Sequence, residues 1–309
     1  AVGSLCAHRR AGQPACRLRE NRGLQTEPPT QDTFLRMSHT ATAFTFRSVT
    51  PFVGASIAWH LLALAVAALI PGAALWAFGA IVLNHVVITV AGLTPRSTLL
   101  GRNVSRLPAG AVARGEVAIT IDDGPDPDVT PAVLDLLDAA GQKATFFCIA
   151  ERVAAYPVLA REIVARGHSI QNHTARHRHD FSLLGPKAYA EELERAQRIV
   201  AQVTGQAPSC FRAPAGFRNM FLAPVLQRMG LTLVSWTRRG FDTREADALR
   251  VLERLTRGLA AGDILLLHDG NAARSPNGRP VVLDVLPPLL AQLHSRGLRA
   301  VTLPQGLAS

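Results

Sequence analysis

The sequence predicts an α/β fold, a distorted seven-stranded (β/α) barrel preceded by an apolar helical hairpin. Three observations predict it. From about residue 115 to residue 303, short apolar runs alternate with amphipathic stretches of helical period. Before them lies a long run, residues 48–95, without any Asp, Glu, Lys or Arg. Polar side chains also follow several predicted strands directly, where parallel barrels carry their active sites.

Composition narrows the class of protein. The chain has 309 residues, 48% of them hydrophobic, which is enough for one large domain with a sizeable core. The formal net charge is +10, but Lys143 and Lys187 are the only lysines, and no basic cluster is interleaved with aromatic residues. We therefore expect no nucleic-acid partner. The four cysteines form no CxxC pair, so a disulfide framework is not expected.

The N-terminal part reads as three segments. Residues 1–50 are rich in Arg, Gln, Thr and Pro, show no sustained periodicity and are predicted to be disordered. The first methionine is Met37, so residues 1–36 are interpreted as an upstream extension that the natural protein lacks. Residues 51–95 are predicted to form two transmembrane helices, since 52–70 and 73–92 each approach the ~20 apolar residues of a membrane span. Residues 96–114 are interpreted as a linker.

The apolar run has an alternative interpretation, as a buried hairpin of a soluble protein. Its three polar side chains mark either a function or helix–helix packing; they are His60, Asn84 and His85. Arginines flank the run on both sides, which favours a hairpin with both ends in the cytoplasm. The sequence thus predicts a protein of the bacterial inner membrane whose main domain faces the cytoplasm. The flanking arginines are Arg36 and Arg47 before the run, and Arg96, Arg102, Arg106 and Arg114 after it.

The main domain, residues 115–303, supplies the strands and helices of the barrel. Helices are predicted to begin near Thr130-Pro131 and Tyr156-Pro157, with proline at a favourable first position. Another covers 186–205, and the last precedes Gly297, because glycine often follows a helix end. The predicted strands are 117–121, 144–149, 168–172, 209–213, 231–236, 263–268 and 298–303.

Candidate catalytic and metal-binding side chains follow the ends of these predicted strands. Two adjacent carboxylates end the first strand, although like charges so close repel unless a cation is near. If His173 and His177 lie on one helical face, their imidazoles and the carboxylate of Asp123 would hold a divalent metal. Such a metal lowers the pKa of water and polarises a carbonyl oxygen. His168 and His179 are interpreted as surface or supporting residues. The candidate side chains are Asp122, Asp123, His173, His177, Arg212, Trp236, Asp242 and His268.

The remaining candidates fit hydrolysis of an amide or ester. Asp122 would deprotonate the water, with Arg212 as its cationic partner. His268 would protonate the leaving nitrogen, and a hydrogen bond to Asp242 would keep its imidazole cationic. Trp236 can alternatively be interpreted as a core residue at the end of a strand, without a role in the site.

Five short motifs resemble those of the polysaccharide deacetylases with a NodB-homology domain, carbohydrate esterase family 4. They are TIDDG (120–124), HTARH (173–177), RAPAG (212–216), W…FD (236–242) and LLLHD (265–269), within residues 115–303. The resemblance implies a NodB-like barrel, a divalent metal such as zinc, and removal of N-acyl groups, usually N-acetyl, from sugar polymers. It implies Asp122 as base and His268 as acid, with Arg212 orienting the base and Asp242 tuning the acid. The implied metal ligands are Asp123, His173 and His177.

Two positions depart from the family pattern. Ala215 stands where an aromatic residue is common, although the family uses the backbone N–H there for the oxyanion. Thr243 follows Asp242 where the family often has a tryptophan, which walls the acyl pocket beside the residue equivalent to Leu266. Ala215, Trp236 and Leu266 are therefore the expected substrate-binding residues.

The expected substrate is an N-acylated amino sugar in a polymer or linked to a lipid. Two other functions stay open at this point. Two histidines and one carboxylate also bind ferrous iron in oxygenases. A membrane-anchored carbohydrate-binding protein without catalysis is the other.

Overall fold

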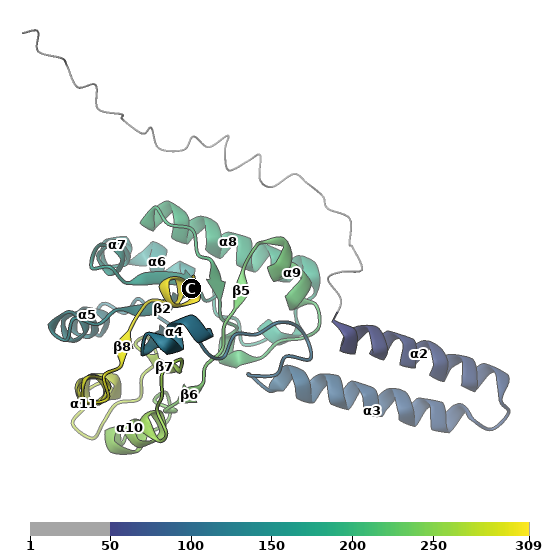
Figure 1. Cartoon of the computed structure of the whole chain (residues 1–309). Coiled ribbons are helices and arrows are strands. Elements are labelled where there is room, and N and C mark those ends of the chain that lie inside the picture. The colour runs from purple at the N-terminus through teal and green to yellow at the C-terminus, as the bar shows by residue number, and fades with distance from the viewer. Residues whose placement is uncertain (1–49, 309) are drawn as a thin grey trace, which may run out of the picture. The chain divides into compact units, whose positions relative to one another are not determined.

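The computed structural model describes residues 50–308. The predicted disordered segment, except its last residue, and the predicted upstream extension lie outside these residues. The described part contains an apolar helical hairpin, a connecting segment and an α/β domain (Figure 1).

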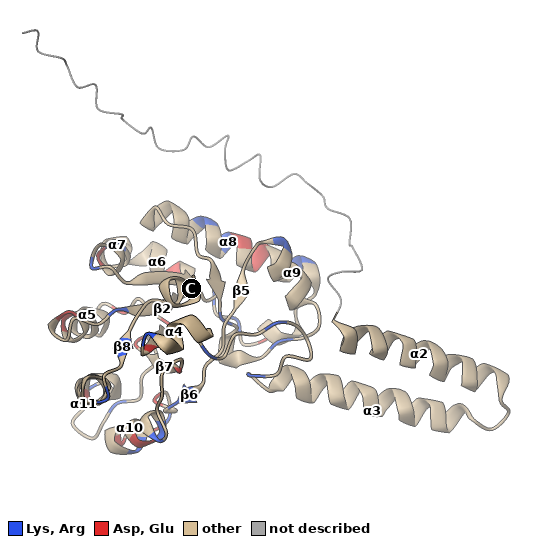
Figure 2. Cartoon of the chain, viewed as in Figure 1, with Lys and Arg blue, Asp and Glu red and all other residues tan. Residues whose placement is uncertain are grey.

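Two long helices form the hairpin, α2 (Pro51–Leu69) and α3 (Ala74–Leu93). The Thr50 side chain accepts a hydrogen bond from the Val53 N–H at 3.2 Å, and Pro51 occupies the first helical position, so the start of α2 is well specified. Neither helix carries a charged residue (Figure 2), and most of their side chains are exposed. Both are long and apolar enough to cross a membrane. Apolar helices that their own protein leaves uncovered are typical of membrane segments rather than of a soluble core.

The polar side chains of the hairpin contact one another across the two helices. The Nε2 atoms of His60 and His85 lie 3.2 Å apart, and the Ser56 hydroxyl donates to Asn84 Oδ1 at 3.3 Å. These contacts join α2 to α3, which favours the helix–helix packing interpretation of these residues.

Residues 94–115 pack against the domain. The Val104 N–H donates to the Leu233 carbonyl at 2.9 Å, and the Ser235 N–H donates to the Val104 carbonyl at 2.8 Å. Leu107 is buried in the domain, just before the short helix α4 (Ala109–Ala113). The segment predicted as a linker therefore extends the sheet locally beside β5 (Thr232–Leu233).

A curled sheet of parallel strands forms the centre of the domain, as predicted. Its path runs β5-β4-β3-β2-β1-β7-β6, seven strands in all, and β8 pairs with β1 off this path. The sheet is a half-barrel whose strand C-termini share one rim. The bounds are β1 (Glu116–Asp122), β2 (Ala144–Cys148), β3 (Ser169–Asn172), β4 (Cys210–Phe211), β6 (Arg238–Arg239), β7 (Ile264–His268) and β8 (Arg299–Ala300).

The predicted strand 231–236 is shortened in the structure to β5, and β6 follows beyond the predicted range. The Val234 N–H donates to Phe211 of β4 at 2.9 Å, whereas the Thr237 N–H donates to Ile264 of β7 at 2.9 Å. The chain thus changes partner within three residues, so β5 and β6 are two ends of one extended segment. Because β5 and β6 are the two end strands of the path and do not pair with each other, the barrel is left open at this point.

Helices surround the sheet (Figure 1) and bury its outer face. Along β1, Ile119 and Ile121 face the outer core, whereas Ala118 faces the inner core. This alternation of period two directs Asp122, the last residue of β1, toward the inside of the barrel. The further helices are α5 (Thr130–Ala139), α6 (Ala150–Ala155), α7 (Pro157–Ala165), α8 (Pro186–Thr204), α9 (Leu222–Arg228), α10 (Ala248–Thr256), α11 (Val281–Ser295) and α12 (Leu303–Leu307), with 3-10 turns η2 (Phe181–Leu183) and η3 (Pro214–Gly216).

Candidate active site

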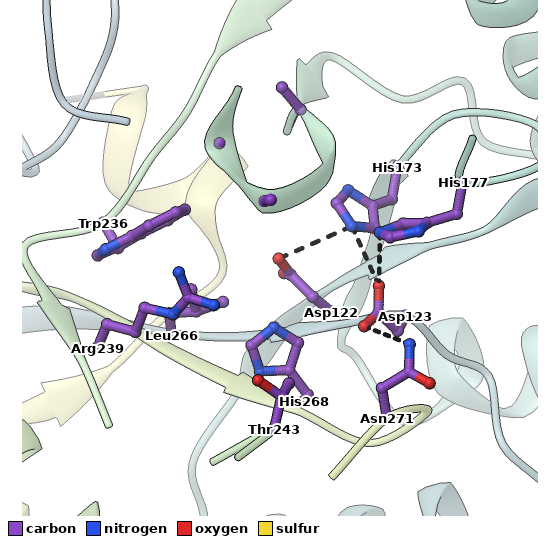
Figure 3. A pocket seen from close by; sticks show the side chains of 13 residues that line it. Asp122, Asp123, His173, His177, Trp236, Arg239, Thr243, Leu266, His268 and Asn271 are labelled. Carbon is purple, nitrogen blue, oxygen red and sulfur yellow. Dashed lines mark hydrogen bonds and ion pairs between the residues drawn. The ribbon is translucent and has the colours of Figure 1, made fainter. Parts of the chain in front are cut away.

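The two adjacent carboxylates reach the same pocket because the backbone turns between them. A strand that continued straight would direct Asp122 and Asp123 to opposite faces of the sheet. Asp123 instead adopts a left-handed conformation with φ 76°, which aspartate tolerates better than most residues. Both side chains line one pocket of about 180 Å³ (Figure 3).

Asp123, His173 and His177 form a metal-binding triad. Asp123 Oδ1 lies 3.2 Å from His173 Nε2 and 3.3 Å from His177 Nε2 (Figure 3). Two ligand atoms of a tetrahedral metal with 2.0–2.1 Å bonds are separated by about 3.3 Å, so this spacing fits one shared ion. Asp123 Oδ1 is also buried and accepts no hydrogen bond from the described residues. A carboxylate oxygen left in this way needs a cation.

Neighbouring groups orient these ligands. The Nδ1 of His173 donates to the Arg212 carbonyl at 2.9 Å, which leaves the lone pair of Nε2 directed at the triad. The Asn271 side-chain amide donates to Asp123 Oδ2 at 2.9 Å, so Oδ1 faces the imidazoles. Burial works against the charged form of Asp123, but the imidazoles of His173, His268 and His177 around it hold the pKa of this carboxyl well below its usual range.

The two histidines do not lie on a helix, so the helical face that their spacing would allow is not formed. They lie in a turn after β3 in which Thr174 and His177 have positive φ, 68° and 53°. The Asn172 side chain accepts from the Thr174 N–H at 2.9 Å, and the Thr174 hydroxyl accepts from the His177 N–H at 2.8 Å. These side-chain hydrogen bonds replace helical ones and bring the two imidazole centroids to 5.0 Å.

Asp122 forms a buried ion pair with Arg212. Arg212 Nη1 lies 2.6 Å from Asp122 Oδ1 and donates also to the Thr120 hydroxyl at 2.8 Å. The Ser235 carbonyl accepts from Nη2 at 2.9 Å, and the guanidinium lies 4.1 Å from the Phe147 ring centroid. Burial lowers the pKa of Arg212, yet a guanidinium stays charged. The second oxygen of Asp122 lies 4.0 Å from His173 Nε2, beside the triad.

A second buried pair consists of His268, which lines the pocket, and Asp242. Asp242 accepts twice from His268, from Nδ1 at 2.9 Å and from the backbone N–H at 2.7 Å. Burial opposes the charged imidazole, but the charge of Asp242 and its hydrogen bond outweigh burial and raise the pKa of His268 to about 9. A cationic imidazole at neutral pH can donate a proton to a leaving group.

The pocket wall includes Ala215, Trp236 and Leu266, the three expected substrate-binding residues. Ala215 has φ 53° inside η3, a conformation that few residues other than glycine adopt. The pocket also contains two residues that the sequence reasoning missed, Arg239 and Asn271. Asn271 lies three residues after the end of β7, so the rim pattern could have pointed to it; Arg239 gave no such signal.

Fold and site together define a metal-dependent hydrolase of the α/β class, and comparisons with known proteins specify the family. The family model described as "Polysaccharide deacetylase" matches residues 109–234. A peptidoglycan-N-acetylglucosamine deacetylase of Bacillus cereus is 33% identical over 191 residues, covering 61% of this chain and 86% of the relative. A chitooligosaccharide deacetylase of Bradyrhizobium is 34% identical over 196 residues, covering 61% and 89%.

Solved structures agree with these relatives. The crystal structure of the peptidoglycan N-acetylglucosamine deacetylase Bc1960 superposes with a TM-score of 0.61 at 26% identity, covering 67% of this chain and 93% of that one. The chain belongs to the polysaccharide deacetylase family, carbohydrate esterase family 4. The deacetylase interpretation of the motifs is thereby confirmed.

The triad predicts the effect of removing one ligand. Changes outside the ligand shell of a metal lower its affinity by ~10–100-fold, and we expect His177→Ala, which removes a ligand, to reduce divalent-metal affinity by more than that. His177 is partly exposed, so its loss should leave the fold intact. His179→Ala, an exposed histidine two residues away, is the matched control. Metal content after dialysis measures the effect; equal metal content in both variants would contradict the assignment.

Proposed function

We propose that this protein is a zinc-dependent deacetylase that removes the acetyl group from an N-acetylated amino sugar. The observation that carries the proposal is that two buried ion pairs adjoin one metal triad, one pair containing the proposed base and the other containing the proposed acid. Asp122 is paired with Arg212 and His268 with Asp242, and Asp122 and His268 line the same pocket as the triad. One carboxylate with two imidazoles is a donor set that suits zinc, with positions left for water and substrate.

Hydrolysis of the amide then divides among the residues of this chain. When bound, the metal supplies positive charge that acidifies a water molecule and polarises the carbonyl oxygen of the acetyl group. Asp122 takes the proton from the attacking water, and Arg212 orients that carboxylate. His268 donates its proton to the sugar nitrogen as the C–N bond breaks. The products are acetic acid and the free amine, equivalent to acetate and the ammonium form of the sugar, and transfer of the proton gained by Asp122 back to His268 through solvent restores both residues.

The substrate class follows from the relatives and from the pocket. The relatives in the comparison act, by their names, on N-acetylglucosamine of peptidoglycan and on chitooligosaccharides, and the same N-acetyl sugars are the proposed substrates. Leu266 and Trp236 provide an apolar wall for the acetyl methyl group. The iron-oxygenase alternative loses its support with the family assignment, and a sugar binder would not need a paired base and acid.

The apolar hairpin is proposed to anchor the domain in the bacterial inner membrane, with the domain on the cytoplasmic side. Contacts at the base of α3 support a substrate in that membrane, such as a lipid-linked saccharide. The Arg218 N–H donates to the Gly92 carbonyl at 3.1 Å, and its guanidinium donates to the Ser97 carbonyl. Pro95 packs so closely on the pocket residue Gly216 that a Cβ there would lie 2.6 Å from the Cβ of Pro95. The pocket edge thus adjoins the end of α3.

Mass spectrometry tests the proposal directly. The full chain, loaded with zinc in detergent, is incubated with N-acetylglucosamine oligomers and with lipid-linked N-acetyl sugars. We expect a mass loss of one acetyl group per reacted sugar, together with stoichiometric acetate. A zinc-loaded protein that releases acetate from none of these substrates would contradict the proposal.

A further inference from the structure

Arg239 presents a guanidinium to the pocket that the proposed mechanism does not use. It lies on β6 in register with Leu266 of β7, and both side chains line the pocket. Its guanidinium carbon lies 5.3 Å from the Trp236 ring centroid and 5.0 Å from that of Phe241, so two aromatic rings hold the side chain. In Figure 3 the guanidinium points into the pocket beside Leu266, toward the side that holds His268.

The charge of Arg239 has no partner among residues 50–308. No carboxylate lies within ion-pair distance of its guanidinium there, no acceptor hydrogen-bonds to it, and its Nε is buried. Its sequence neighbour Arg238 behaves differently, because Arg238 pairs with Asp263 and donates to the Gly258 carbonyl. Holding an unpaired cation partly out of water costs free energy, and an anion that enters the pocket would recover it.

The other charges of the site are already balanced within the protein. Arg212 neutralises Asp122, and Asp242 balances the imidazolium of His268. Asp123 is the one carboxylate of the metal triad, so a bound divalent cation leaves a net positive charge there. Arg239 adds one more, and the loaded pocket therefore attracts anions.

Part of the wall of this pocket carries no bulky side chain. The side chains of Ala215 and Thr243 are small, and both line the pocket. A substrate can therefore carry a substituent next to its N-acetyl group without meeting a bulky wall. A planar guanidinium binds two oxygens of a carboxylate or phosphate at once, which a neutral hydroxyl substituent does not match.

We propose that Arg239 determines specificity by binding an anionic substituent, a carboxylate or a phosphate, carried by the amino sugar beside the N-acetyl group that is removed. This inference rests on the proposed deacetylase function and narrows its substrate class. The carboxylate would belong to an acidic ether substituent on the ring carbon next to the one that carries the N-acetyl group. The phosphate would be on the anomeric carbon, as in a sugar attached to a lipid phosphate.

Three substrates and four proteins test the role of Arg239. The substrates are a neutral N-acetylglucosamine oligomer, an oligomer containing N-acetylmuramic acid, which carries a carboxylate, and N-acetylglucosamine 1-phosphate. The proteins are the wild type, Arg239→Gln, Arg239→Lys and Arg250→Gln, whose arginine is exposed on α10 and controls for net charge. Acetate release gives kcat/KM for each combination, and thermal unfolding checks that each variant is folded.

The ratio of anionic to neutral kcat/KM is the deciding quantity. We expect Arg239→Gln to lower kcat/KM by ~10–100-fold on at least one anionic substrate and by at most ~3-fold on the neutral oligomer. Arg239→Lys should restore part of the preference, and Arg250→Gln should match the wild type. The preferred anionic substrate identifies carboxylate or phosphate as the ligand.

Other outcomes separate this inference from the proposed function. Deacetylation with an anionic-to-neutral ratio that Arg239→Gln leaves unchanged would overturn the inference alone. An equal loss on all three substrates would do the same, because it indicates a general structural role held by the two rings. Acetate release from no substrate by the wild type would instead count against the deacetylase function.

Discussion

Replacing Asp122 by asparagine is expected to lower kcat by ~10³-fold or more while zinc content stays unchanged. A general base contributes ~10²–10⁴-fold, and an amide in its place cannot accept a proton. The change is nearly isosteric, and the asparagine oxygen can still accept from Arg212 Nη1, which lies 2.6 Å from Asp122 Oδ1. Asp122 is not a member of the triad, so the ligand atoms remain. Steady-state kinetics and metal analysis on the same preparation measure both quantities.

Two controls make the Asp122 result specific. Asp128→Asn removes an exposed carboxylate from the loop after β1 and should leave kcat within about twofold. Arg212→Met should also be inactive, but through instability, because it leaves the Asp122 carboxylate buried and unpaired. An Asp122→Asn protein that keeps zinc, unfolds at the wild-type temperature and retains most of its kcat would remove Asp122 from the mechanism.

The sequence was sufficient to predict which rim carries the chemistry. Parallel strands end on one side, so residues that follow them converge whatever the length of the intervening helices. Position alone therefore predicted Asp122, Arg212 and His268. In the structure Asp122 and His268 line one pocket. The Arg212 side chain does not line it but is paired with Asp122. The family motifs added the roles.

Local backbone conformation was the part that sequence reasoning did not reach. The i, i+4 spacing of His173 and His177 suggested a helix, but a turn with two positive-φ residues brings the imidazoles together. Such turns depend on side-chain hydrogen bonds that have no periodicity to read. Similarly, the run 231–236 looked like one strand because hydrophobicity does not record which neighbour a strand pairs with. The change of partner at Val234–Thr237 moved Arg239 into the pocket wall, and so this residue was missed.

Asp242→Asn is expected to lower kcat at neutral pH by ~10²-fold or more and to move the basic limb of the pH profile to lower pH. The wild-type imidazole of His268 has its pKa raised to about 9, so the proton donor is present below that pH and is lost as pH rises through it. Without the charge of Asp242, burial is the dominant effect, and burial favours the neutral imidazole. The donor is then absent over part of the range in which the wild type is active.

The direction of this pH shift distinguishes proton donation from a structural role. A loss of positioning alone would lower kcat by the same factor at every pH, whereas loss of the cationic form changes the shape of the profile. His268→Gln should abolish the basic limb altogether, because no titrating donor remains at that position. Measurement of kcat from pH 6 to pH 10 on the preferred N-acetyl sugar checks both variants. If Asp242→Asn retained a basic limb near pH 9, Asp242 would not be the group that keeps His268 protonated, and the acid would have to be sought elsewhere in the pocket.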